Sequence, residues 1–279
     1  MTTKPSFTTA NGLATLGAKA VRLRDQLENK FLQWAAECNA ETMAFPPLMR
    51  VADLDKLDYF RNFPHLVTIA SRIRSDNLAA DYASGPSVNS IPPSHMDPSG
   101  YVLPSAACYS IYIDLRDSIL DEPKYVTTVA SCFRNEDEYK GLQRLWGFTM
   151  REIVCIADSE TVKSHLDSFK RRISAFAEEI DLPLEKQIAT DPFYQQQSSR
   201  ALMQSLFPVK EEFVYGGSVA IASANYHRNF FGERCNIRLA DGSPAHSGCV
   251  AFGIERWLHA LFDRFGGDFQ LAGQGVHRE

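Results

Sequence analysis

Two neighbouring segments of the sequence read CFRNE, at residues 132–136, and RLWGFTMRE, at residues 144–152. β-Branched and aromatic residues are enriched over Tyr125–Phe133 and Phe148–Ala157, so we expect two strands joined by a short charged loop. Such a connection favours antiparallel pairing. Arg134 and Phe148 would then face one side of a hairpin, where they could bind a phosphate and stack on a base. On charge pattern alone, a solvated hairpin with surface ion pairs is the alternative.

The rest of the chain predicts an α+β fold, an antiparallel sheet with helices packed on it. Apolar residues recur at helical spacing over 14–38 and 159–180. A Pro-, Ser- and Gly-rich stretch at 76–100 predicts an irregular loop. Further strands are expected at Ala106–Leu115, Phe213–Ala222 and Cys235–Leu239, and a strand entering a helix at Cys249–Phe265. We expect one domain over 1–279, with a largely helical insertion at about 159–212.

A second informative stretch reads GCVAFGIERW, at residues 248–257. A glycine-punctuated apolar strand leads into a helix there, and backbone amides at such a junction favour an anion. A tight strand-to-helix turn with a capping arginine is the alternative.

Composition excludes several classes of protein. The 279 residues are 44% hydrophobic and 23% charged, which is ordinary for a globular chain. The net charge of −5 makes a general nucleic-acid binder a poor candidate. Apolar runs are too short to span a membrane, and the polar N-terminus does not predict a secretory signal. The six dispersed cysteines predict reduced thiols in a cytoplasmic protein.

Together the two stretches resemble class II aminoacyl-tRNA synthetases. Residues 133–148 resemble motif 2 through Phe133, Arg134, Glu136, Arg144 and Phe148, and GIER at 253–256 resembles motif 3. FPPLM at 45–49 is similar to the proline-bearing motif 1 of the dimer interface. ASANYH at 222–227 is similar to the Ser/Asn-rich strand of seryl-tRNA synthetases.

Three residues occupy the positions at which zinc-dependent, methanogen-type seryl-tRNA synthetases carry metal ligands. They are Cys108, Glu152 and Cys249. Two thiolates and a carboxylate give zinc three protein ligands and leave a fourth position open, as in a catalytic site. Glu152 also lies on an otherwise apolar strand, and a buried carboxylate needs a partner. Without the resemblance, three unconnected core residues would be the alternative. Cys38, Cys132, Cys155 and Cys235 are expected to be core residues.

The resemblance implies an ATP-dependent activation. It assigns Arg134 to the α-phosphate and the substrate carboxylate, and Glu136 to the adenine or ribose side. The resemblance implies that Phe148 and Arg256 enclose the adenine. Arg144 and Arg256 would face the outer phosphates with Mg²⁺. Ser223, Asn225 and His227 would line the substrate pocket. For His227, a structural role is an equal alternative. The acidic metal-binding position of seryl-tRNA synthetases aligns near Val219, so the Mg²⁺ ligand is left open, with Glu211 and Glu212 nearby.

Motif 1 begins within the first fifty residues, without the long tRNA-holding arm of seryl-tRNA synthetases. The chain therefore resembles the bacterial amino acid:[carrier protein] ligases. These activate a small amino acid, glycine or alanine by family, and load the phosphopantetheine thiol of a holo acyl-carrier-like protein. The resemblance implies a homodimer, no tRNA partner and a carrier-docking patch at 185–212, where Arg200 and Lys210 could meet an acidic surface. A synthetase with a separate tRNA-binding subunit and a non-catalytic regulatory paralogue remain as alternatives.

Overall fold

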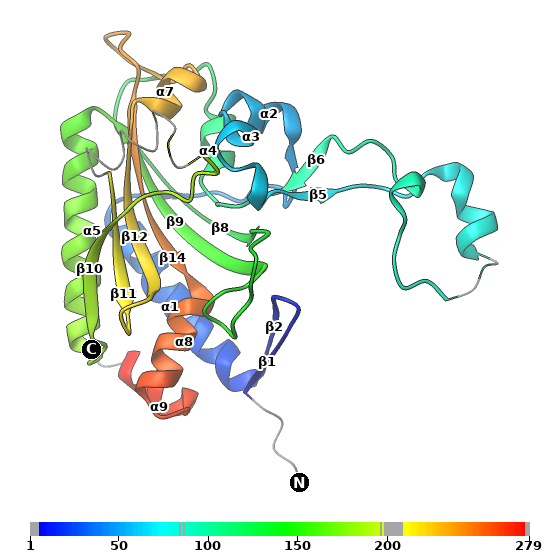
Figure 1. Cartoon of the computed structure of the whole chain (residues 1–279). Helices are drawn as coiled ribbons and strands as arrows, with labels where there is room; N and C mark the ends of the chain where they lie inside the picture. Colours follow the sequence, from blue (N-terminus) through cyan, green and yellow to red (C-terminus); the bar gives the residue numbers. More distant parts are fainter. Residues whose placement is uncertain (1–5, 84, 86, 196, 198–208, 277–279) are drawn as a thin grey trace.

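A seven-stranded sheet forms the centre of the computed structural model, which describes residues 6–83, 85, 87–195, 197 and 209–276 (Figure 1). The strand order is β10-β11-β12-β14-β9-β8-β3, with antiparallel neighbours except for the parallel β3–β8 pair. Its strands are β3 (Glu41–Thr42), β8 (Lys124–Phe133), β9 (Gly147–Ala157), β10 (Leu184–Ala189), β11 (Lys210–Tyr215), β12 (Val219–Arg228) and β14 (His246–Gly253). The architecture confirms the predicted α+β class.

The remaining elements surround this sheet. The shorter strands are β1 (Phe7–Ala10), β2 (Leu13–Leu16), β4 (Met49–Arg50), β5 (Thr68–Ala70), β6 (Tyr101–Leu103), β7 (Ile119–Leu120) and β13 (Arg238–Leu239). Within the described residues, the α-helices are α1 (Ala18–Glu37), α2 (Val51–Lys56), α3 (Tyr59–Asn62), α4 (Tyr109–Asp114), α5 (Ser159–Glu179), α7 (Phe230–Arg234), α8 (Ile254–Arg264) and α9 (Phe269–Val276). No helix within the described residues is long and apolar enough to cross a membrane.

The helices α1, α5 and α8 cover one face of the sheet and build the larger core with it. Their apolar residues recur every three or four positions, so each helix buries one stripe against the strands. Asp158 caps α5, because its side chain accepts the backbone N–H groups of Glu160 and Thr161.

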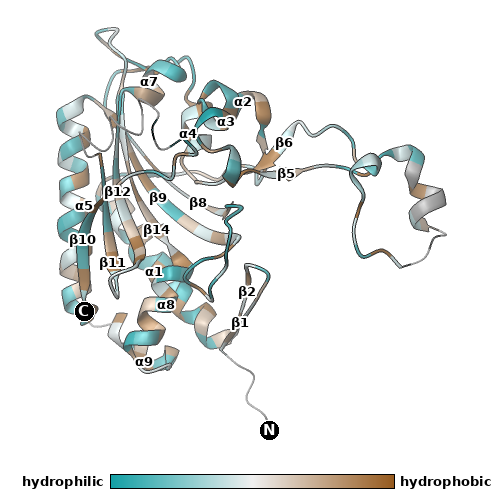
Figure 2. Ribbon diagram, viewed as in Figure 1, coloured by the Kyte–Doolittle hydropathy of each residue, from teal (hydrophilic) through white to brown (hydrophobic). Residues whose placement is uncertain are grey.

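The strand β9 is buried on both faces, and its alternation decides which side chains reach the site. Ile153 and Cys155 lie in the core under the helices, whereas Val154 belongs to the cluster on the opposite face with α2, α4 and α7. Successive side chains of a strand point to opposite faces, so Glu152 shares the face of Val154. Figure 2 shows hydrophobic and polar segments interleaved along these strands.

Several expected elements differ from the structure. The strand expected at Ala106–Leu115 is instead a turn followed by helix α4, and the Glu152 carboxylate accepts backbone N–H groups at the start of that helix. The strand expected at Phe213–Ala222 is a hairpin, because Gly216 and Gly217 adopt positive φ values of 57° and 74°.

Smaller differences concern element ends. The helix expected over 14–38 begins only at Ala18, because residues 13–16 pair with β1, and only Arg238–Leu239 forms a strand within Cys235–Leu239. In the predicted helical insertion, Leu184–Ala189 is strand β10 of the central sheet.

The segment between β5 and β6 extends away from the body (Figure 1). The loop expected at 76–100 within it contains short helical turns.

Candidate active site

Three residues from three separate elements meet on the face of the sheet opposite α1 and α5. Cys108 precedes α4, Glu152 lies on β9 and Cys249 lies on β14. The two sulfur atoms and a carboxylate oxygen lie within 4.8 Å of one another, and all three residues are buried. Glu152 pairs with Ala251, two residues from Cys249, so the strand register places both side chains on one face. The structure thus brings the predicted ligand set together.

Only one of the two Glu152 carboxylate oxygens has hydrogen-bond partners among the described residues. Its Oε1 accepts the backbone N–H groups of Ala107, at 2.9 Å, and Cys108, at 3.3 Å. Its Oε2 is buried and has no hydrogen-bond partner among the described residues. A buried carboxylate oxygen without a partner is costly, and a cation beside the two thiols would remove that cost. Two thiolates and a carboxylate are a donor set that zinc accepts with one position left open.

The thiols of this cluster are hard to ionise without a cation. A hydrogen bond with Cys249, burial and the Glu152 carboxylate raise the pKa of the Cys108 thiol well above its usual range. The hydrogen bond with Cys108 lowers the pKa of Cys249, but burial and Glu152 outweigh it and raise that pKa to about 11. A bound divalent cation reverses such shifts, since it deprotonates a coordinating thiol.

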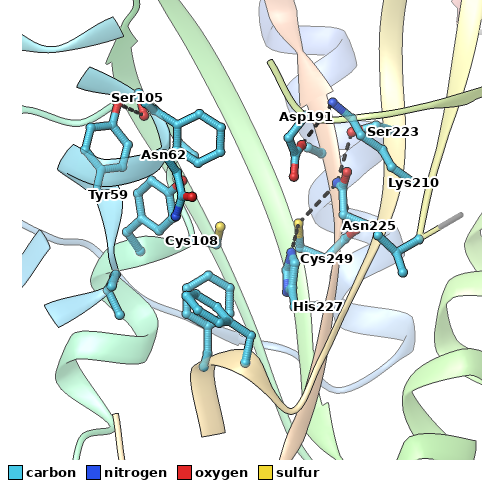
Figure 3. Close-up of a pocket in the computed structure, with 18 of the residues that line it drawn as sticks. Tyr59, Asn62, Ser105, Cys108, Asp191, Lys210, Ser223, Asn225, His227 and Cys249 are labelled. Atoms are coloured by element: carbon cyan, nitrogen blue, oxygen red, sulfur yellow. Dashed lines mark hydrogen bonds and ion pairs between the residues drawn. The ribbon is translucent and has the colours of Figure 1, made fainter. Parts of the chain in front are cut away.

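A cavity of about 370 Å³ has this cluster in its lining. Its size is that of a small-molecule site. In Figure 3, Tyr59 and Asn62 lie across the cavity from Asn225 and Lys210, and the sulfur atoms of Cys108 and Cys249 lie between them. The side of Tyr59 is largely aromatic, with Tyr59, Phe63, Tyr109, Phe193, Phe230 and Phe231 in the lining.

The polar side of the cavity comes from alternate residues of β12. Asn225 donates to the Ser223 hydroxyl at 3.0 Å and approaches the Cys249 sulfur at 3.4 Å. The Nε2 atom of His227 lies 3.7 Å from the same sulfur, and its Nδ1 atom lies 3.1 Å from the Tyr112 hydroxyl. The structure therefore places Ser223, Asn225 and His227 together in the lining, beside the cluster.

A second cavity, of about 80 Å³, adjoins the first and is lined by four of the motif 2 and motif 3 residues. Arg134, Glu136, Phe148 and Arg256 all line it. The Arg134 guanidinium lies 5.1 Å from the centre of the Phe148 ring, and its Nε donates to the Ser105 carbonyl at 3.0 Å. This arrangement combines a cation and an aromatic face, which suits a nucleotide.

Arg256 is held rigidly at the wall of this second cavity. It donates to the carbonyl oxygens of Gln143, at 2.9 Å, and Ala220, at 3.0 Å. Burial lowers its pKa from the ordinary arginine value. These bonds fix the plane of the guanidinium, so a base can stack on it without an ordering cost.

Arg144 and Glu255 lie beside the second cavity and hold neighbouring segments together. Arg144 is about half exposed and lines neither cavity. Its Nε atom lies 3.2 Å from a carboxylate oxygen of Glu136, which lines the second cavity. Glu255 is buried and accepts the backbone N–H and the hydroxyl of Thr149, at 2.7 and 2.9 Å. Burial raises the pKa of Glu255. Glu255 thus ties the start of α8 to β9, joining motif 3 to motif 2.

Lys210, which we expected on a carrier-docking surface, instead lines both cavities. Residues two apart on a strand share one face, so Lys210 lies on the same face of β11 as Glu212. This spacing is the sequence signal that could have placed Lys210 in the site. Glu212 lines the second cavity, whereas Glu211 lies 3.8 Å from Lys170 of α5. Val219 is buried at the start of β12. Arg200 lies outside the described residues.

Residues 100–265 match the family described as the tRNA synthetase class II core domain (G, H, P, S and T), so the chain belongs to that class. The fold agrees with this. The structure superposes with a TM-score of 0.76 on Methanopyrus kandleri seryl-tRNA synthetase, solved with an Aquifex aeolicus tRNA. That similarity, at 20% identity, covers 93% of this chain and 58% of the synthetase.

Comparison with curated proteins identifies the chain's relatives within this class of synthetases. The chain is 34% identical over 250 residues to amino acid–[acyl-carrier-protein] ligase 1 of Bradyrhizobium diazoefficiens, covering 83% of this chain and 74% of that protein. It is 25% identical to the type-2 serine–tRNA ligase of Methanococcus aeolicus, covering 81% of this chain and 47% of the ligase. The chain therefore belongs to the amino acid–[acyl-carrier-protein] ligases, which are relatives of methanogen-type seryl-tRNA synthetases.

Proposed function

We propose that the protein activates a small amino acid with ATP and transfers it to the phosphopantetheine thiol of a carrier protein. The observation that carries the proposal is the Cys108–Glu152–Cys249 cluster, with its unpartnered carboxylate oxygen, in a cavity that adjoins the one lined by Arg134, Phe148 and Arg256. Relatives named amino acid–[acyl-carrier-protein] ligases support the acceptor. Glycine and alanine are the first candidates for the amino acid.

Zinc is the metal that the cluster would hold, on Cys108, Glu152 and Cys249. When bound, it would supply a Lewis acid that anchors the free α-amine of the substrate. Ser223, Asn225 and His227, on the neighbouring strand, would enclose the amino acid beside this anchor. We propose that these three residues bind the substrate and that the cluster selects for an unprotonated amine.

Arg134 is the proposed catalytic residue of the first step, because it lines both cavities. It would bind the substrate carboxylate and the α-phosphate of ATP. A carboxylate oxygen forms a bond to the α-phosphorus, and the bond to the pyrophosphate leaving group breaks. The Arg134 guanidinium would stabilise the negative charge that develops on the phosphoryl oxygens.

Phe148 and Arg256 would hold the adenine by stacking and cation–π contact, and Glu136 would contact the adenine amino group or the ribose. Mg²⁺, when bound, would neutralise the outer phosphates. We propose that Arg144 contacts these phosphates only after leaving its ion pair with Glu136.

In the second step, the sulfur of the carrier thiol would attack the carbonyl carbon of the adenylate. A thioester bond forms, AMP leaves and the thiol proton is released. A single thiol on a flexible arm needs only a narrow entrance and a modest docking patch. We propose that this patch lies within 185–212, of which 196 and 198–208 are outside the described residues. The net charge of −5 gives little attraction to the tRNA polyanion.

We also propose a homodimer in which residues 45–49 lie in the interface. These residues line a groove of about 1020 Å³, and Leu48 is exposed in it. The apolar stripe of α1 packs on its own sheet, so α1 can contribute only its outer face. Sedimentation of the purified protein tests this, and a monomer with full activity would refute it.

Amino-acid-dependent exchange of pyrophosphate into ATP, measured over a panel of amino acids, tests the first step. We expect exchange with a small amino acid and no tRNA or carrier in the assay. Exchange with none of the panel would contradict the proposed activation.

A further inference from the structure

The two cavities meet at a short junction that five residues share. These residues, which line both cavities, are Arg134, Met150, Lys210, Ser223 and Ala251. Two of the five carry a positive charge, and they come from distant parts of the chain. Arg134 follows β8, whereas Lys210 begins β11.

Lys210 is held at this junction by two carboxylates. Its Nζ atom lies 3.0 Å from Oε1 of Glu212 and 3.5 Å from Oδ1 of Asp191. Its side chain is 16% exposed. The backbone register places Lys210 beside Asn225 and Glu212 beside Ser223. Lys210 therefore lies on the site face of the sheet, next to two residues of the polar side of the cavity (Figure 3).

An ammonium group carries three N–H donors, and the two carboxylates engage it from two directions. A third donor can still reach a ligand. The lysine ammonium is a compact charge on a flexible side chain. A small movement of the end of the side chain is therefore enough to keep its hydrogen bond to a group that shifts during the reaction.

We propose that Lys210 is a second catalytic cation of the adenylation step. This inference rests on the proposed function, in which the amino acid occupies the larger cavity and the nucleotide the smaller one. The carboxylate oxygen and the α-phosphorus then meet at the junction. Lys210 donates a hydrogen bond to a non-bridging oxygen of the α-phosphate, with Arg134 as the other cation of the junction. The bond to pyrophosphate breaks as the carboxylate attacks, and Lys210 keeps its proton throughout.

A purely structural role predicts a different result. Asp191 precedes Phe193, whose ring stacks on Phe63 with centroids 5.2 Å apart. If Lys210 only tied Asp191 in place, its loss would disturb this aromatic side of the cavity. The KM for the amino acid would then rise and the melting temperature would fall, with kcat largely kept. A catalytic cation instead acts on charge that develops in the transition state, so its loss lowers kcat.

The test compares Lys210→Met and Lys210→Arg with a control, Lys56→Met, in pyrophosphate exchange by the whole chain. Lys56 is exposed at the end of α2, away from both cavity linings. We expect Lys210→Met to lower kcat by about a hundredfold, the scale for one transition-state donor, with the KM for the amino acid within about twofold. Lys210→Arg should recover part of the rate, and the control should match the wild type.

Three outcomes would overturn the inference. They are a kcat of Lys210→Met within about twofold of wild type, a change confined to KM, and an arginine variant no better than the methionine variant. If Lys210→Met does not fold, Lys210→Gln, which keeps a polar but uncharged and slightly shorter side chain, takes its place under the same criteria. Wild-type protein without exchange would refute the proposed function itself, whereas active wild type with an active Lys210→Met would refute only the role of Lys210.

Discussion

Replacing Cys108 by alanine removes one of three ligands from the proposed zinc site and should abolish both metal binding and activation. The Cys108 sulfur lies within 4.8 Å of the Cys249 sulfur and a Glu152 oxygen, so the remaining two donors cannot close around the ion. Binding of a four-ligand zinc site is worth about 10–16 kcal/mol, or about 3 kcal/mol per ligand if shared evenly. That amount corresponds to a loss of about a hundredfold or more in zinc affinity.

The matched control is Cys155→Ala. Cys155 is also fully buried on β9, but it lies in the core beneath the helices rather than in the cluster. Its loss should lower the free energy of unfolding by about 1 kcal/mol and leave zinc and activity in place. Elemental analysis of the purified proteins gives the zinc content, and pyrophosphate exchange gives the activity. Metal-free protein that still activates an amino acid, or zinc retained fully by Cys108→Ala, would refute the assignment.

Three further outcomes are expected. Arg134→Ala should slow pyrophosphate exchange by about a hundredfold, the scale for one lost transition-state donor, and a negligible loss would exclude Arg134 from the reacting site. Burial lowers the pKa of His165 to about 4, so the folded protein resists its protonation. Unfolding free energy should fall by up to about 3 kcal/mol as the pH drops from about 6.5 towards 4, because the unfolded state binds the proton first, and His165→Leu should flatten this limb of a denaturant titration. A Cβ at Gly232 would lie 2.1 Å from the Ala245 carbonyl oxygen, so Gly232→Ala should cost about 1–3 kcal/mol in unfolding free energy, whereas Gly100→Ala, in open space, should cost under 1 kcal/mol. Equal melting temperatures for the two glycine variants would contradict this packing.

The sequence predicts the α+β class and the long elements well, because these depend on local pattern. Helix α5 and strands β8 and β9 follow from helical spacing and β-branched enrichment within one or two residues. The Gly216–Gly217 turn was missed, although two glycines between apolar runs are a hairpin signal.

Helix α4 shows where local pattern fails. Residues 109–114 are rich in aromatic and β-branched side chains, which favour a strand. Their helical form is fixed by contacts that are distant in sequence. Ile111 and Tyr112 are buried in the cluster above the sheet, and the Glu152 carboxylate binds the backbone before the helix. Tertiary packing decides such a short segment.

The site itself was predictable only through the resemblance. Cys108, Glu152 and Cys249 are far apart along the chain, and their spacing does not indicate a metal site. The place of Lys210 in the lining of both cavities was missed for a physical reason, because the strand was expected to begin at Phe213. With β11 starting at Lys210, its side chain alternates onto the site face together with Glu212.

Loading of a carrier protein is the measurement that tests the central claim most directly. The purified protein, ATP and the amino acid selected by exchange are mixed with a holo carrier, with the same carrier in its apo form, or with bulk tRNA. Mass spectrometry of the carrier and acid-precipitable label on tRNA report the product. The account predicts one aminoacyl group on the holo carrier and none on the apo carrier or on tRNA. Charging of tRNA without any loading of holo carrier, or loading of the apo form, would contradict it.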